Sequence, residues 1–580
     1  MALEGSEQGR NLTVAGGVFL VYVLLTMGFT YPLVLHLTTG IPRHNNDVWI
    51  ALWNNWWFHK AFVTEQNYYF TPYLFYPRGV NLATHSNSLL SSALSALFLP
   101  LLGPLGAFNV VFLLTFPVGA LGMYFFVRDL TAHPLAAFAA GVTYAFAPYY
   151  MTQGMAHPNL GSVQWFPYIA LFLYRAMFRN QIHAGAVAGF FLALAVWSGL
   201  QLGLLAGLWV GLFVVWALIT DRRTRSKASL AAPACMVLVA FLFSIPVLLP
   251  VLRSWSPEQV DFLLVERETG QTDLLAYFVP PYYHPVWKPF VAPVYGRFVK
   301  NKGWMPYVGF TPLGLAFYVS LKERHKASFW YLSSLLWIIL ALGAFLRVNG
   351  RVHPEIPLPY SLVDHIFPFN TLRSSDRFNL LVPLSLAVLV GLALARLERP
   401  WLSLATVALI GFEYLCAPLP VRQPIEPSPF FLKLSAAPGS YAVLDLPMGR
   451  HPSKKWMYFQ TIHEKPLVEG MIARLPVDAY DFVETVPLLY AFRHDYKAPI
   501  SSPAHDLCLL ANVGVRYIFI HINYTTPERI ERWSSWFPSP PIYRDDLLIV
   551  FATSDGCRAS HYKPTAGLHT RIPRPFPHNR

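Results

Sequence analysis

Residues 229–252 have the sequence SLAAPACMVLVAFLFSIPVLLPVL, which contains no charged side chain and follows the basic cluster 222–227 (RRTRSK). A helix needs about 20 predominantly apolar residues to cross the hydrocarbon core of a bilayer. Basic residues beside such a helix favour the cytoplasmic side of the membrane. The stretch therefore predicts a membrane-spanning helix that begins on the cytoplasmic side.

The composition of the whole chain agrees with this prediction. Of its 580 residues, 54% are hydrophobic and 13% are charged, whereas about 25% of residues are charged in soluble domains. This excludes a cytosolic globular enzyme, a disordered chain and a small disulfide scaffold. The net charge of +13 comes from 44 basic and 31 acidic residues. Because the basic residues gather in short clusters between apolar runs, they indicate membrane topology and not nucleic-acid binding.

About eleven stretches are long and apolar enough to be spans. They lie near 14–36, 107–127, 135–152, 162–178, 184–199, 203–220, 229–252, 306–321, 328–346, 378–395 and 401–418. The run 89–102 has only about 14 residues, so it fits an interfacial or re-entrant helix better than a span. No A-x-A-like cleavage site follows the first stretch, which we therefore interpret as a retained anchor.

The basic residues also predict the orientation of the bundle. With a cytoplasmic N-terminus, the short outer turns 153–161 and 199–202 hold no Lys or Arg, in agreement with the excess of positive charge in cytoplasmic loops. The inner loops hold Arg128; Arg175 and Arg179; the cluster 222–227; Lys322, Arg324 and Lys326; and Arg396 and Arg399. The long segments 37–88, 253–305 and 347–377 then lie outside. Because functional residues concentrate on loops carried by a rigid scaffold, we expect activity on the outer face of the inner (plasma) membrane.

Residues 420–560 predict a small extracytoplasmic α/β domain after the membrane domain 1–419. Three β-rich runs bounded by turn residues predict strands, at 441–446 (YAVLDL), 515–522 (VRYIFIHI) and 547–551 (LLIVF). Cys508 and Cys557 could form a disulfide in an oxidising compartment. The tail 561–580, rich in Pro, Arg and His, predicts disorder. No Cys-x-x-Cys pair or Cys/His spacing indicates a zinc site.

The first outer segment combines an isolated acid with a Trp-rich helix. Asp47 follows the polar residues His44-Asn45-Asn46 and precedes VWIALWNNWWFHKAF (48–62), in which four Trp residues recur at helical spacing. Trp prefers the membrane–water interface, so we expect this helix to lie on the membrane surface. Asp47 either caps the helix or takes part in chemistry, and its position alone leaves both open.

Two further outer stretches contain histidines that suit a polar ligand. His85 and Asn87 lie just before the run 89–102, where Ser86 or Asn87 could equally act as an ordinary helix cap. His157 lies in the uncharged turn QGMAHPN, where it either donates hydrogen bonds at the membrane surface or packs as an ordinary loop residue.

The second outer loop contains residue types typical of sugar sites, although ordinary loops contain them as well. Asp273, His284 and Trp287 stand in TDLLAYFVPPYYHPVW. The carboxylate and the imidazole can bind hydroxyl groups, and the indole ring can stack on a sugar face.

The third outer loop ends in LRSSDRF (372–378), which contains Arg373, Asp376 and Arg377. Arg373 and Arg377 are four residues apart, so in a helix they would share one face. Two guanidiniums on one face suit a phosphate or pyrophosphate. The alternative is contact with lipid head groups.

Several stretches, in this order, resemble the membrane glycosyltransferases of the GT-C superfamily, in an uncharacterised bacterial branch. They are Asp47 in the first outer loop, FYPRGVNLATHSNSLL, MAHPNL, TDLLAYFVPPYYHPVW, LRSSDRF, MYFQTIHEKPLVEGMIAR and GVRYIFIH. The resemblance implies a lipid-phosphate sugar donor and transfer on the outer leaflet. It also implies that Asp47 is the catalytic base, because members often use an acid in the first outer loop. The stretch Asn45-Asn46-Asp47 offers one carboxylate, and a divalent metal stays open as a cofactor.

The sequence thus predicts an inverting glycosyltransferase that moves a sugar from a polyprenyl-phosphate donor to a glycan, lipid or protein acceptor. Asp47 would be the general base, and Arg373 and Arg377 would bind the phosphate. His85, His157 and Asp273 would position the substrates, His284 and Trp287 would line the sugar site, and the Trp-rich helix would guide the lipid. Two alternatives stay open: a transporter or flippase of lipid-linked glycans, which predicts charged residues within spans, and a non-catalytic cell-envelope assembly factor.

Overall fold

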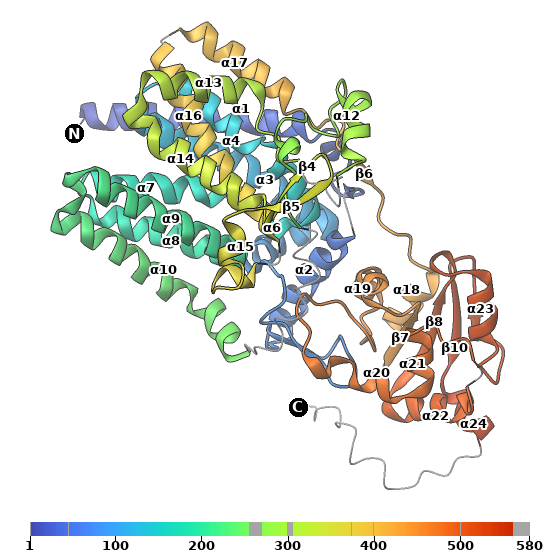
Figure 1. Cartoon of the computed structure of the whole chain (residues 1–580). Helices are drawn as coiled ribbons and strands as arrows, with labels where there is room; N and C mark the ends of the chain where they lie inside the picture. The colour runs from blue at the N-terminus through green and yellow to red at the C-terminus, as the bar shows by residue number, and fades with distance from the viewer. Residues whose placement is uncertain are drawn as a thin grey trace. The chain divides into compact units, whose positions relative to one another are not determined.

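The structure is a computed structural model that describes residues 2–43, 46–254, 270–298, 305–372, 374–397, 399–498 and 500–560 (Figure 1). The tail 561–580, for which we predicted disorder, lies outside the described residues. The chain divides into two compact units. The first comprises Met1–Val48, Asn87–Leu249 and Val260–Gln423, and the second comprises Trp49–Ser86, Pro250–Gln259 and Pro424–Arg580.

The first unit is built almost entirely from helices. They are α1 (Ala2–Phe29), α3 (Leu89–Thr131), α4 (Pro134–Ala145), α5 (Pro148–Ala156), α6 (Pro158–Gly161), α7 (Phe166–Phe178), α8 (Ile182–Ser198), α9 (Leu200–Thr220), α10 (Lys227–Ser254), α12 (Lys288–Tyr295), α13 (Phe310–Lys322), α14 (Arg324–Ala341), α15 (Tyr360–Val363), α16 (Val382–Leu397) and α17 (Pro400–Glu413). Two short antiparallel pairs accompany them: β1 (Ile41–Pro42) with β6 (Val421–Arg422), and β4 (Phe345–Val348) with β5 (Arg351–Pro357).

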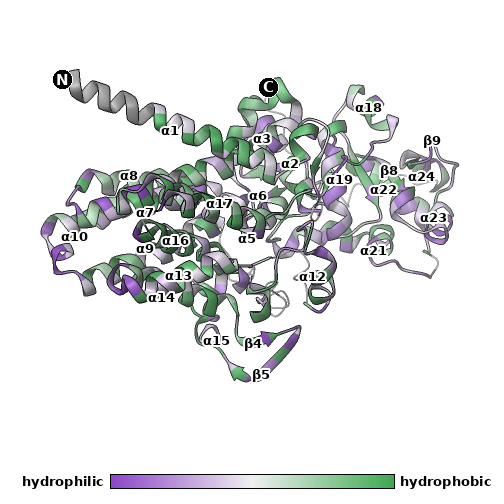
Figure 2. Cartoon of the chain, turned by 90° about the horizontal axis from the view of Figure 1, so that it is seen from above, coloured by the Kyte–Doolittle hydropathy of each residue, from purple (hydrophilic) through white to green (hydrophobic). Residues whose placement is uncertain are grey.

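The helices of this unit are those of a membrane protein. Among the described residues, four are long and apolar enough to cross a bilayer: Leu89–Thr131, Leu200–Thr220, Lys227–Ser254 and Ser375–Leu397. Shorter apolar helices cover Thr13–Phe29, Pro134–Ala145, Ile182–Ser198 and Pro400–Glu413. On α10, Val237, Leu238, Phe241, Leu242 and Phe243 are all exposed, as expected of a helix that faces lipid (Figure 2). The total of about eleven spans stays a prediction.

Helix α3 joins the run 89–102 to the predicted span at 107–127. Ser88 accepts a hydrogen bond from the Ser91 amide and caps the helix, in place of Ser86 or Asn87. Gly103 interrupts the helical geometry with φ of 65°, a conformation that Gly adopts at little cost. The run 89–102 is therefore a separate helical segment, and its interfacial or re-entrant placement stays a prediction.

Small residues let α4 pack closely between α3 and α16. Ala136, Ala139 and Ala140 of α4 are fully buried. A Cβ atom on Gly391 of α16 would lie 2.4 Å from Cγ1 of Val127 in α3, so only glycine fits there. Close helix contacts through Gly and Ala are typical of helices packed inside membranes.

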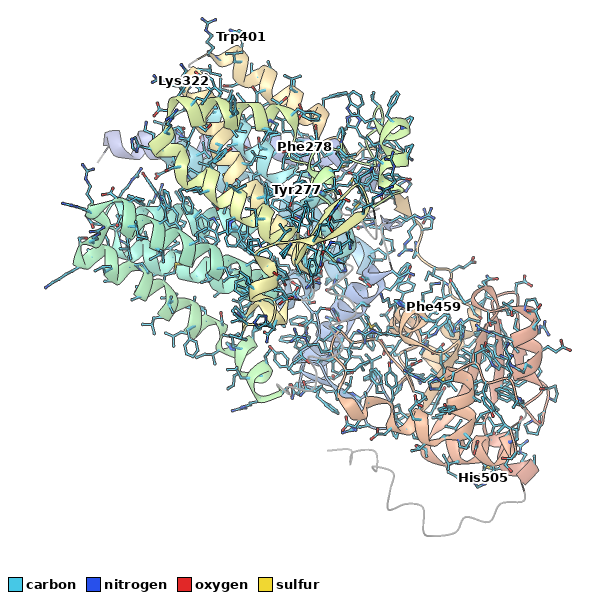
Figure 3. The ribbon with its side chains drawn as sticks, in the orientation of Figure 1. Tyr277, Phe278, Lys322, Trp401, Phe459 and His505 are labelled. Atoms are coloured by element: carbon cyan, nitrogen blue, oxygen red, sulfur yellow. A yellow bond between two sulfur atoms is a disulfide. The ribbon has the colours of Figure 1, made fainter. Side chains whose placement is uncertain are left out.

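The loops predicted to be cytoplasmic contact one another within the first unit. Arg175 and Arg179 both pair with Asp129 at 2.8 Å. Arg396, in the last turn of α16, pairs with Glu323, which follows α13, at 3.6 Å. Figure 3 places Lys322 at the end of α13 and Trp401 at the start of α17 at the same end of the helices. The grouping matches the predicted topology.

The second unit is a four-stranded mixed sheet flanked by helices. The strand order is β7-β8-β10-β9; β7 and β8 are parallel, and the other neighbours are antiparallel. The strands are β7 (Ala442–Leu446), β8 (Val515–His521), β9 (Tyr543–Arg544) and β10 (Leu548–Ala552). Three of them lie within about one residue of the predicted runs. The helices are α18 (Pro429–Ala436), α19 (Arg450–His463), α20 (Asp481–Thr485), α21 (Pro487–Arg493), α22 (Pro503–Val513), α23 (Pro527–Ser534) and α24 (Ser554–Ser560).

The Trp-rich helix belongs to the core of this second unit. It is α2 (Asp47–Val63), and it is followed by the short pair β2 (Phe70–Thr71) and β3 (Val80–Asn81). Trp49, Trp53 and Trp57 are fully buried, and Trp53 Nε1 donates to Gln460 Oε1 at 2.6 Å. Our prediction of a helix lying on the membrane surface was wrong. A spacing of four residues places these rings on one helix face, and α19 and the sheet cover that face instead of lipid.

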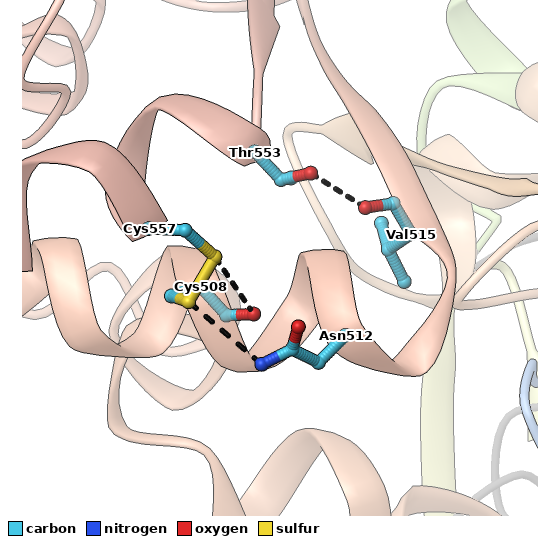
Figure 4. The surroundings of a disulfide bond; sticks show 5 residues. All are labelled: Cys508, Asn512, Val515, Thr553 and Cys557. Carbon is cyan, nitrogen blue, oxygen red and sulfur yellow. Dashed lines mark hydrogen bonds between the residues drawn. A yellow bond between two sulfur atoms is a disulfide. The ribbon is translucent and has the colours of Figure 1, made fainter. Parts of the chain in front are cut away.

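A disulfide joins the last two helices of the second unit. Cys508 of α22 and Cys557 of α24 are bonded (Figure 4). Thr553 lies beside this link and donates from its hydroxyl to the Val515 carbonyl at 2.6 Å. The bond ties α24 to α22, the helix that precedes β8.

Candidate active site in the first unit

Asp47 and His157 form the centre of the candidate site. Oδ2 of Asp47 lies 2.8 Å from Nε2 of His157, and the two side chains are 23% and 26% exposed. Asp47 is the first residue of α2, and His157 links α5 to α6. Both were predicted from separate outer segments, and the structure brings them together. Because both remain partly exposed, a substrate hydroxyl can reach the carboxylate.

Hydrogen bonds from α5 connect His157 to the third outer loop. Pro148 begins α5, and the Tyr149 hydroxyl donates to the Asp376 carbonyl at 2.7 Å. The Gln153 amide donates to the Tyr149 hydroxyl at 2.9 Å. These buried bonds fix the turn that carries His157 against the segment that carries Asp376 and Arg377.

Asp376 and Arg377 lie in the 3₁₀ helix Ser375–Leu380 that leads into α16. Asp376 is 5% exposed and interacts electrostatically with both Arg377 and His157. The Ser374 hydroxyl donates to the Asp376 carboxylate, and Arg377 Nη1 donates to Gln201 Oε1. The guanidinium is thus held by Gln201 of α9 next to Asp376, and Asp376 in turn interacts electrostatically with His157. Within the first unit, the carboxylates of Asp47 and Asp376, the imidazole of His157 and the guanidinium of Arg377 therefore form one cluster.

Two residues near this cluster were missed by the sequence analysis. Gln201 lies in the first turn of α9, within the stretch 199–202 that we predicted to be an outer turn without Lys or Arg. Arg422 lies in β6, pairs with Ile41 across the short sheet, and donates to Asn46 Oδ1 at 3.2 Å. It is 375 residues from Asp47 in sequence, so no local pattern could have shown that it lies near the start of α2.

Asp273 has a structural role instead of the predicted substrate-binding role. Oδ1 accepts from the amides of Leu275 and Asn349, each at 2.9 Å, and Oδ2 accepts from the Gly350 amide at 2.7 Å. The residue is fully buried. It caps the 3₁₀ helix Leu274–Tyr277 and holds the β4–β5 turn, so no oxygen is left for a sugar. This prediction is corrected.

His284 is likewise occupied by the protein. Nδ1 accepts from the amides of Val286 and Trp287, and Nε2 donates to the Phe412 carbonyl at 2.7 Å. The residue is fully buried, so its predicted place in a sugar site is also corrected. Trp287 is 38% exposed and makes edge-to-face contacts with Phe290 and Phe412. Its role in binding stays a prediction.

His85 lies in the second unit, where both ring nitrogens are used. Nε2 bonds to Asn54 Oδ1 at 3.1 Å, and Nδ1 accepts from the Ala473 amide at 3.0 Å. Burial lowers the pKa of His85 from 6.5 to about 3, so the ring is neutral. It supports the fold of that unit, and its predicted substrate contact is corrected. Asn87 belongs to the first unit and is half-buried; its role stays a prediction.

The remaining predictions concern Arg373 and a metal. Arg373 lies outside the described residues, so its pairing with Arg377 stays a prediction. In the part of the chain that the structure describes, no group of three His, Cys, Asp or Glu side chains could hold a metal ion. Within the described residues, the candidate site therefore has no assigned set of metal ligands.

Three solved structures resemble the chain in fold. The mycobacterial arabinofuranosyltransferase AftD has a TM-score of 0.57 and 13% identity, covering 93% of this chain and 41% of that one. The Archaeoglobus fulgidus oligosaccharyltransferase has a TM-score of 0.51 and 12% identity, covering 90% and 71%. ArnT from Cupriavidus metallidurans, bound to undecaprenyl phosphate, has a TM-score of 0.50 and 13% identity, covering 94% and 98%. All three are GT-C glycosyltransferases.

The chain has a GT-C-like fold. The superfamily resemblance predicted from the sequence is confirmed at the level of fold. No family model matches the chain, and no curated protein matches it either. At these identities the likeness concerns the fold alone, so the site residues depend on their own geometry.

Proposed function

We propose that the chain is a membrane glycosyltransferase that moves a sugar from a polyprenyl-phosphate donor to an extracytoplasmic acceptor. The observation that supports this most directly is the 2.8 Å contact between Asp47 and His157, beside Asp376 and Arg377, in a GT-C-like fold. One of the similar structures holds undecaprenyl phosphate, which agrees with a lipid-phosphate donor. The acceptor is a glycan, lipid or protein hydroxyl or amide.

In this proposal, Asp47 takes the proton from the acceptor as the acceptor attacks the sugar carbon. His157 holds the carboxylate in place through Nε2 and stabilises its charge. Arg377 binds the departing phosphate and stabilises the negative charge that develops on it. The bond from the sugar to the acceptor forms as the bond to the phosphate oxygen breaks. Among the described residues, the other carboxylate of the cluster, Asp376, is buried and accepts from the Ser374 hydroxyl, which leaves Asp47 as the single base and favours one displacement with inversion at the sugar carbon.

The proposed topology has the N-terminus in the cytoplasm and the second unit outside. Predicted inner loops contact each other through Asp129 and Glu323. Predicted outer segments contact each other through Asp47 and Asp273. The Cys508–Cys557 disulfide favours an oxidising compartment for the second unit. Which side of the plasma membrane each end faces is part of the proposal.

A transporter is less well supported, because such proteins place ionisable groups within their spans. Glu413, an acid within the predicted span 401–418, is the last residue of α17. Its carboxylate accepts from the Thr311 amide at 3.0 Å and from the Thr311 hydroxyl at 2.6 Å. It therefore caps the start of α13 and leaves no free charge for a transport path.

The test is mass spectrometry of envelope glycans and lipid-linked sugars from a deletion strain that carries plasmid copies of the gene. Wild type should restore the missing glycan. Asp47→Asn keeps the shape of the side chain and removes the base, so transfer should fall by about 10²–10⁴-fold, while the lipid-linked sugar accumulates.

Asp364→Asn is the matched control, because Asp364 also contacts a histidine (His365, at 3.2 Å) and is 33% exposed. It should restore the glycan fully. Normal glycan levels with Asp47→Asn, at normal protein abundance, would show that Asp47 is not the base.

A further inference from the structure

A second cavity lies within the second unit, at the carboxyl ends of the parallel strands β7 and β8. Its volume is 250 Å³. Its lining includes the aromatic residues Phe431, Phe459 and Tyr524 and the polar residues His521, Glu426 and Asn523. Phe459 of α19 is labelled in Figure 3. In open α/β sheets, ligands bind outside the carboxyl ends of the parallel strands.

One lining residue, His521, belongs to a buried Asp–His pair. His521 is the last residue of β8, and Asp445 is the last but one of β7. His521 Nε2 donates to Asp445 Oδ1 at 2.7 Å, and both side chains are 4% exposed. Trp456 stacks on the imidazole at 3.7 Å between ring centroids. The ring is therefore fixed in orientation with Nε2 directed at the carboxylate.

Several polar atoms around the cavity have unused bonding capacity within the described residues. Asp445 Oδ2 is buried and has no hydrogen-bond partner there. His521 Nδ1 makes no hydrogen bond, and the exposed side chains of Glu426 and Asn523 make none either. Buried acceptors in native proteins are almost always paired with protein or water. Open acceptors and donors around a small hollow indicate a ligand that carries hydroxyl groups.

We propose that this cavity binds one neutral sugar residue of a glycan. A volume of 250 Å³ lies below the roughly 300–1,000 Å³ of sites for drug-sized ligands, and so suits a single ring. Phe431 and Phe459 offer apolar faces to the ring's C–H groups. Glu426, Asn523 and His521 Nδ1 offer acceptors and donors to its hydroxyls.

The charges near the cavity argue against an ionic ligand. No Lys or Arg lines it, and the Glu426 carboxylate in its lining repels phosphate and uronate groups. A cationic ligand would meet Lys455, whose ammonium already lies over the Tyr524 ring at 3.7 Å from the centroid. A neutral hydroxylated ring is repelled neither by the Glu426 carboxylate nor by the Lys455 ammonium. The site goes beyond transfer itself, since it uses no residue of the Asp47–His157 cluster, and it would retain a glycan at the second unit.

The test measures binding of neutral methyl glycosides to the full chain in lipid nanodiscs by saturation-transfer-difference NMR. A panel of methyl hexosides and pentosides is compared with glucosamine and glucuronic acid at about tens of millimolar, the range of weak sugar binding. At least one neutral glycoside should bind, and the two charged sugars should bind more weakly. Asn523→Ala and Glu426→Gln should each weaken binding by about fivefold, the effect of one lost hydrogen bond.

Two control variants separate this site from the rest of the chain. Glu531→Gln changes an exposed carboxylate on α23 outside the cavity and should bind as wild type does. Asp47→Asn should also bind as wild type does, so failure of the proposed transferase reaction would leave this result unaffected. No binding of any neutral glycoside, or equal binding by wild type, Asn523→Ala and Glu426→Gln, would overturn the proposal.

Discussion

Arg377→Lys separates phosphate binding from structural support. The guanidinium of Arg377 donates to Gln201 and interacts with the buried Asp376 carboxylate. Lysine keeps a positive charge beside Asp376 but removes the planar fork that can grip two phosphate oxygens at once. Arg377→Ala also removes the charge, which leaves the Asp376 carboxylate without its cation and costs about 3–5 kcal/mol of folding stability. The lysine variant is therefore the cleaner perturbation.

The expected loss of affinity for the lipid phosphate is that of one hydrogen bond, which Arg377 can make to the phosphate and lysine cannot. A hydrogen bond to a charged group contributes about 1.5–3 kcal/mol, which corresponds to a roughly ten- to hundredfold weaker Kd for the lipid phosphate. Thermal stability should change little, since the charge pair is retained.

The assay measures the Kd of polyprenyl phosphate for the full chain in nanodiscs by native mass spectrometry. Arg351→Lys, at an exposed position on β5, is the matched control and should bind as wild type does. If Arg377 only contacts bulk lipid head groups, Arg377→Lys should lower the retention of phosphatidylglycerol and of polyprenyl phosphate by the same factor. A Kd within about twofold of wild type for Arg377→Lys, and for any folded Arg377→Ala, would refute the phosphate role.

Three further predictions concern topology, pH and the disulfide. An alkaline phosphatase fused after Pro420 should be active, because it would be exported; a cytoplasmic reporter active there would contradict the proposed orientation. Burial lowers the pKa of His85 and His463 from 6.5 to about 3. As the pH falls, the unfolded chain therefore binds these protons at a higher pH than the folded chain does. The free energy of unfolding should fall between pH 6.5 and pH 3, by up to about 1.4 kcal/mol per pH unit for each histidine. Denaturant unfolding followed by Trp fluorescence measures this change. His463→Asn should reduce that slope. Cys508→Ser with Cys557→Ser opens a link across 49 residues and should cost about 2–4 kcal/mol in denaturant unfolding, while thiol labelling at Cys508 and Cys557 of wild type should require a reductant.

The fold could be predicted from sequence wherever a pattern depends on local geometry. Runs such as 441–446 and 515–522 gave strands because β-branched residues bounded by turns favour a pleated, buried conformation. The spacing in the Trp-rich stretch predicted a helix for a similar reason, but it could not predict what surrounds that helix. A face of Trp49, Trp53 and Trp57 is equally apolar against lipid and against α19, so the sequence could not tell the two apart. The covering residues, such as Gln460, are about 400 positions away.

The candidate site was predicted only in part, because residue type shows what a side chain can bind and not what it has already bound. Asp273 and His284 were as plausible as Asp47 and His157 by type and by loop. In the structure, both carboxylate oxygens of Asp273 accept hydrogen bonds from backbone amides, and both ring nitrogens of His284 bond to backbone groups. Asp47 and His157 bond to each other while each stays about a quarter exposed. A catalytic group must keep a heteroatom open to substrate. Whether it does depends on partners such as Asn349 and Phe412, which lie far away in the chain and are brought close only by folding.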